Sequence, residues 1–141
     1  MDEMFDSLHS ASLTTDIRIL VVERSTDIQD RLQKILTVAL EMKVVGVTAS
    51  SAQAAQMVSE LEPNVVLMDM VVDDLDRILD AKKIQENSPQ VGVILVMENG
   101  RPSDGQAVAM MDGGVRDCLH THFSLDDLAS SIRNCYLLHQ T

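Results

Sequence analysis

Five short apolar runs, separated by polar loops and amphipathic stretches, dominate the pattern of this chain. They cover residues 17–22, 44–48, 64–70, 91–96 and 115–119. Each run is too short for a helix and carries β-branched residues, which is typical of strands buried on both faces. The central run goes directly from four apolar residues into Asp69. The pattern predicts a parallel sheet with Asp69 at or just past the end of its third strand.

The segments between and after these runs show the spacing of helices that pack on a sheet. Helices are expected from about residues 27, 51, 75, 103 and 125, with serine caps on several of them. The predicted inward residues of the third and fourth helices include Leu75, Ile78, Leu79, Val108 and Met111. Alternating strands and helices predict an α/β fold, a doubly wound five-stranded parallel sheet in the flavodoxin-like order 2-1-3-4-5.

Composition narrows the class of protein. The 141 residues fit one domain (17–141) after a tail-like segment (1–16), and 45% hydrophobic residues can form a core. A net charge of −11 argues against direct contact with nucleic acid. Cys118 and Cys135 lie in apolar patterns, which favours buried thiols in a reducing compartment. With no signal peptide and no apolar run near membrane-spanning length, we expect a cytoplasmic protein without membrane insertion.

Three groups of residues are candidates for chemistry. Asp69 is either a reactive or metal-binding group or a solvated strand end, because the carboxyl edge of such sheets is where ligands bind. Asp73, Asp74 and Asp76 form a cation site or, as we favour, the charged start of a helix. His120 and His122 could join Asp69 on a transition metal, but a solvated pair is favoured. No catalytic motif is recognisable, so we expect no enzyme.

The order of elements and their landmarks resembles the receiver domain of two-component response regulators over about residues 17–138. The landmarks are residues 19–22 of the first strand, 63–69 before and through the acceptor strand, and 113–117 before the last strand. The resemblance implies that Asp69 is the phosphoacceptor, that Mg²⁺ is the cofactor and that signalling proteins are the partners.

Several site positions depart from the receiver pattern. The family's acidic pair falls on Glu23 and Arg24, its Thr/Ser on Met97, its Lys on Thr121 and its aromatic switch residue on Cys118. An ion pair from Arg24 to Asp69 or Glu23 could replace the metal, so we expect neither a bound metal nor another cofactor. Mg²⁺ is expected only if Asp69 is phosphorylated. These departures favour a degenerate receiver.

Residues 114–119 and 123–128 further resemble the atypical receivers of the TadZ/CpaE pilus-assembly proteins. That resemblance implies a domain excised from a longer protein, followed by a MinD-like ATPase domain, that localises the pilus or secretion machinery. Our first hypothesis is therefore a non-catalytic module for protein interaction and self-association. The alternative is a receiver that accepts phosphate on Asp69. Receivers commonly pair through the fourth helix, fifth strand and fifth helix, where opposite charges lie at Arg116, Arg133, Asp112, Asp126 and Asp127.

Overall fold

A five-stranded parallel sheet forms the centre of the computed structural model, which describes residues 17–71, 74–98, 102–120 and 122–140. The strands are β1 (Arg18–Val22), β2 (Lys43–Thr48), β3 (Val65–Met70), β4 (Gly92–Met97) and β5 (Asp117–His120). Their order in the sheet is β2-β1-β3-β4-β5, and every neighbouring pair is parallel. The predicted fold class is confirmed. The expected tail, residues 1–16, lies outside the described residues.

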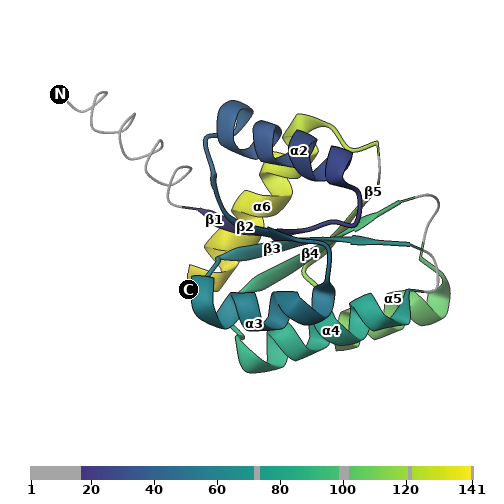
Figure 1. Cartoon of the computed structure of the whole chain (residues 1–141). Helices are drawn as coiled ribbons and strands as arrows, with labels where there is room; N and C mark the ends of the chain where they lie inside the picture. Colours follow the sequence, from purple (N-terminus) through teal and green to yellow (C-terminus); the bar gives the residue numbers. More distant parts are fainter. Residues whose placement is uncertain (1–16, 72–73, 99–101, 121, 141) are drawn as a thin grey trace.

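Helices cover both faces of this sheet (Figure 1). One face carries α2 (Thr26–Lys34), its π-helical continuation η1 (Ile35–Ala39) and α6 (Leu125–Gln140). The other carries α3 (Ser51–Leu61), α4 (Leu75–Asn87) and α5 (Asp104–Asp112). Serine caps begin α2, α3 and α5, where the side chains of Ser25, Ser50 and Ser103 accept a backbone N–H and relieve an unpaired donor.

Alternation along the strands divides the core into two apolar clusters, one on each face of the sheet. Residues such as Val21, Leu67 and Val96 pack toward α2 and α6, whereas their neighbours Val22 and Met68 pack toward α3 and α4. The sheet is therefore buried on both faces, as the continuous apolar runs predict.

The inward faces of two helices differ from the predicted ones. Leu75 and Leu79 of α4 are 59% and 55% exposed, and Val108 and Met111 of α5 are 59% and 79% exposed. Ile78 of α4 is buried as predicted. The other buried residues of these helices are Arg77, Ala81, Ile84, Gln106 and Met110. Arg77 pairs with Asp69 and lies inward beside the apolar residues Ala81 and Ile84.

Candidate functional site

Asp69 lies near the carboxyl end of β3, at the centre of the sheet, and its side chain has no solvent exposure. In the sheet it faces Val96 of β4, while β1 runs along the other side of β3. The segments that follow β1 and β4 are therefore its nearest neighbours in the fold. A buried carboxylate requires partners, because removing a charge from water without compensation is costly.

Two guanidinium groups supply those partners, one for each carboxylate oxygen. Arg24 Nη1 lies 3.1 Å from Asp69 Oδ2, and Arg77 Nη2 lies 2.6 Å from Asp69 Oδ1. The side chain of Arg24 is 46% exposed, whereas that of Arg77 is 3% exposed. The ion pair expected between Arg24 and Asp69 is present, and a second, buried pair accompanies it.

Arg77 was not anticipated from the sequence. It is the third residue of α4, and its Nη2 also donates to the carbonyl oxygen of Ala49 at 3.0 Å, in the loop between β2 and α3. Its Nε is buried and has no hydrogen-bond partner among the described residues. The sequence did contain a signal: Arg77, Ala81 and Ile84 share one helical stripe, and a cation on such a stripe requires a buried counter-charge.

The charges around Asp69 act on it in opposite directions. Burial raises the pKa of Asp69, and the Coulomb interactions with Arg77 and Arg24 limit that rise. Arg24 also binds Asp74 through a second nitrogen, at 2.6 Å. Asp74 thus serves as a partner of Arg24 rather than only as charge at the start of a helix. Asp73 lies outside the described residues.

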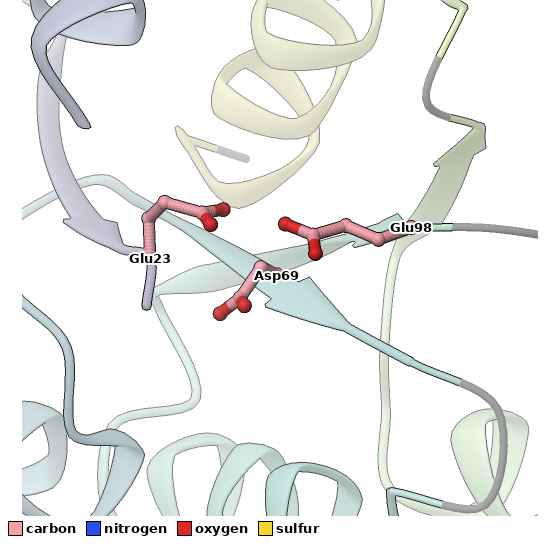
Figure 2. Close-up of side chains that lie close together, drawn as sticks. All are labelled: Glu23, Asp69 and Glu98. Atoms are coloured by element: carbon pink, nitrogen blue, oxygen red, sulfur yellow. The ribbon is translucent and has the colours of Figure 1, made fainter. Parts of the chain in front are cut away.

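Glu23 and Glu98 place two more carboxyl groups beside Asp69 (Figure 2). One oxygen from each of the three residues lies within 4.8 Å of the others. Glu23 follows β1 and is 3% exposed, and Glu98 directly follows β4. Glu98 was missed in the sequence analysis, although it ends a buried strand just as Asp69 does. Its Oε1 is buried and has no hydrogen-bond partner within the described part of the chain.

Burial, together with the crowding of these carboxyl groups, raises the pKa of Glu23. Burial is the largest effect that raises the pKa of Glu23, which reaches about 8 with further contributions from the neighbouring Glu98 carboxyl and the charge of Asp69. A hydrogen bond from the Ser25 backbone to Glu23 opposes the rise. The raised pKa of Glu23 therefore favours the protonated form of its carboxyl beside Glu98 and Asp69.

The arrangement fits Mg²⁺ poorly. Mg²⁺ needs several oxygen ligands in near-octahedral positions, and three carboxyl groups are close enough to contribute. Both oxygens of Asp69, however, already bind guanidinium nitrogens, and Arg24 stands where the receiver pattern has an acidic residue. A metal would have to displace Arg24 and deprotonate Glu23. The expectation of no bound metal stays a prediction.

Two further positions of the receiver pattern, Met97 and Cys118, are described by the structure and lie against apolar residues. Met97 is fully buried in the apolar cluster on the α3–α4 face, and its side chain has no hydrogen to donate. Cys118 is half-buried against the same cluster, and burial raises the pKa of its thiol. Thr121 lies outside the described residues. His120 and His122 are exposed, and the carboxylate cluster found among the described residues does not include them.

Comparison with known proteins identifies the family to which this chain belongs. The family model of the response regulator receiver domain matches residues 19–133, and the chain belongs to that family. Response regulator protein VraR of Staphylococcus epidermidis RP62A is 27% identical over 120 residues, covering 85% of this chain and 56% of VraR. The chain thus spans about half the length of the curated relatives that it matches. Among the described residues, no helix has the length and apolarity to cross a membrane.

Solved structures share the fold. The response regulator domain of Thermotoga maritima CheB is 27% identical, with a TM-score of 0.71 over 86% of this chain and 96% of that one. A Burkholderia pseudomallei protein, provisionally described as pilus assembly-related, is 20% identical with a TM-score of 0.74, covering 86% of this chain and 90% of its own. Identity at that level shows the fold alone. The narrower likeness to TadZ/CpaE proteins is not supported, because the curated relatives are VraR-type response regulators.

Proposed function

We propose that this receiver domain accepts a phosphoryl group on Asp69 and acts as the regulatory domain of a response regulator in two-component signal transduction. The observation that supports this proposal most directly is the contact of Asp69 with Arg24 and Arg77, at 3.1 and 2.6 Å. Guanidinium groups bind phosphoryl oxygens well and neutralise charge that develops during transfer. The family's VraR-type members support the same role. We expect the domain to work in the cytoplasm.

The two arginines suit different parts of that reaction. Arg77 is buried and holds Oδ1 in place, whereas the half-exposed Arg24 can swing away from Oδ2. Oδ2 then attacks phosphorus and forms a P–O bond, while the P–N bond of a phosphohistidine donor breaks and its electron pair stays on the imidazole. Arg24 can return to the transferred group and bind its oxygens.

Small phosphodonors test this proposal directly. The purified domain is incubated with phosphoramidate, with and without Mg²⁺, and its intact mass is measured beside that of Asp69→Asn. We expect one added phosphoryl group in the native domain and none in the variant. The proposal fails if neither protein gains mass under conditions where a conventional receiver does. A gain that persists in Asp69→Asn would also contradict it.

A second candidate is a receiver that works through protein contacts without phosphate, as expected for a pilus-assembly module beside an ATPase domain. The observation that favours it is that Met97 is fully buried in the apolar cluster on the α3–α4 face. In addition, Met97 has no side-chain donor where the family carries Thr or Ser. Retained partner binding by Asp69→Asn, together with no mass gain in the native domain, would support this candidate over the first.

Self-association through α5, β5 and α6 is compatible with either function. Val108 and Met111 of α5 and Leu125 of α6 are large apolar side chains exposed on these elements. We expect light scattering to detect a dimer that Met111→Glu disrupts. Val38→Glu is the matched control, because Val38 is 77% exposed on η1, which is not one of the three elements of this interface. Loss of the dimer in both variants, or in neither, would contradict this interface.

A further inference from the structure

Arg77 joins three segments that are distant in sequence. One nitrogen, Nη2, contacts Asp69 at the end of β3 and the carbonyl oxygen of Ala49 before α3, and the residue itself belongs to the first turn of α4. Arg77 is 2% exposed, so water does not replace either contact. A change in the charge of Asp69 therefore alters the balance of a buried cation that also positions α3 and α4.

A pocket next to Arg77 provides space into which its side chain can move. An open pocket of about 470 Å³ at the amino-terminal ends of α3 and α4 is lined by Arg77, Ser51 and Asp80. Arg24 and Asp74 of the Asp69 site also line it. Asp80 lies three residues after Arg77 on the same helix, a spacing at which side chains meet. At present Asp80 Oδ2 accepts the Ser51 hydroxyl at 2.5 Å, which ties α4 to the first residue of α3. An Arg77 released by Asp69 would compete with Ser51 for Asp80.

The receiver pattern has a Thr or Ser at the position of Met97 and an aromatic switch residue at the position of Cys118. A signal that passed from Asp69 through these two positions would need polar side chains there. Met97 is enclosed in the apolar cluster and has no side-chain hydrogen to donate, and the Cys118 thiol is only a weak donor. Neither side chain can make the strong hydrogen bond that would report a change of charge on Asp69. Arg77, by contrast, already contacts Asp69 directly.

We propose that Arg77 couples the charge on Asp69 to the packing of α3 against α4, so that the α3–α4 face reports the state of Asp69. The inference extends the proposed function, because phosphorylation would be the natural trigger. It does not require phosphorylation to be tested, since Asp69→Asn also alters the charge that Arg77 contacts, in this case by removing it; phosphorylation would instead add negative charge and replace the free carboxylate by an acyl phosphate. Arg77 is a positioning residue that acts through its two contacts.

Hydrogen exchange followed by mass spectrometry tests the coupling in the whole chain. In Asp69→Asn we expect amides of residues 49–54 and 75–80 to exchange about tenfold faster or more, as buried contacts to the freed Arg77 rearrange. Amides of β5 and α5 should keep their native rates. Faster exchange confined to β5 and α5, or unchanged exchange at residues 49–54 and 75–80, would overturn the proposal.

Two arginine variants identify the coupling residue. Arg77→Met keeps the length of the side chain without its charge, so adding Asp69→Asn to it should change exchange at residues 49–54 very little. Arg24→Met is the matched control, because Arg24 binds the same carboxylate but is half exposed; adding Asp69→Asn there should still produce the full increase. Equal responses in both backgrounds would overturn the role of Arg77.

Arg77→Lys keeps the coupling testable if Arg77→Met does not fold. A lysine retains the charge but has a single nitrogen, so it cannot reproduce the fixed geometry of the guanidinium. We expect faster exchange at residues 49–54 even with Asp69 intact, and an unchanged rate there would contradict the proposal. Failure of phosphoramidate to modify Asp69, with a positive Asp69→Asn response, overturns only the proposed function.

Discussion

Arg24 donates to Asp69 across 3.1 Å from a position where the receiver pattern has an acidic residue. A fixed cation thus stands against the carboxylate where related domains are expected to place a metal ligand. The same guanidinium binds Asp74 at 2.6 Å, so it links the segment after β1 to the start of α4. The site is charge-compensated by side chains of the chain itself.

The two arginines should contribute very differently to stability. Replacing Arg77 by Met leaves Asp69 with one buried partner fewer and should cost about 3 to 5 kcal/mol, the range for breaking a buried ion pair. Replacing Arg24 by Met should cost about 1 kcal/mol or less, because solvent screens its half-exposed guanidinium. Urea unfolding of both variants measures the difference. Equal costs would show that burial does not distinguish the two pairs.

Stability should fall as the pH rises from about 4.5 to about 8, because burial raises the pKa of Glu23 to about 8. The native state then holds a proton that the unfolded chain releases, so raising the pH lowers the free energy of unfolding across this window, and above about pH 8 the contribution of Glu23 to stability is lost completely. Each unit of pKa difference corresponds to about 1.4 kcal/mol. Urea unfolding across the window measures the slope.

Glu23→Gln is the control for that slope, since an amide imitates the protonated carboxyl. The variant should lose less stability than the native domain between the two ends of the window and should be the more stable protein at its alkaline end. Parallel stability curves would show that Glu23 ionises normally.

Arg24→Asp should create a cation site. The change removes a positive charge and adds a fourth carboxylate near Glu23, Asp69 and Glu98, so Mg²⁺ affinity should rise about tenfold or more. Titration with MgCl₂, followed by amide NMR, measures it. Arg24→Asn separates the loss of the cation from the gain of a ligand and should bind Mg²⁺ more weakly than Arg24→Asp. If the native domain bound Mg²⁺ as tightly as Arg24→Asp does, the positive charge of Arg24 would not be what keeps the metal out.

Restoring a receiver-like residue at Met97 should destabilise the domain. Met97 is fully buried, so Met97→Thr loses apolar contacts and buries a hydroxyl, at a cost of about 2 to 5 kcal/mol. Met97→Leu conserves volume and should cost less than about 1.5 kcal/mol. Thermal or urea unfolding measures both. A Met97→Thr variant as stable as the native domain would show that the position tolerates a polar group.

Much of the fold could be predicted because its signals are local. The apolar runs of the five strands differ in length and composition from the helical stripes between them, and right-handed crossovers leave few orders for a parallel sheet. The same reasoning placed Asp69 at the carboxyl edge. It failed in part for α4, where Ile78 is buried as predicted but Leu75 and Leu79 are exposed and Arg77 is buried.

The sequence by itself determined the strand order, the position of Asp69 and the presence of Arg24 where an acidic residue is expected. Only the tertiary structure decided which groups neutralise and crowd Asp69: Arg77 from α4 and Glu23 and Glu98 from the segments after β1 and β4. The reason is physical. Secondary structure follows from periodicity within one segment, whereas pairing of buried charges depends on how a helix is rotated and which strand ends meet at one edge of the sheet.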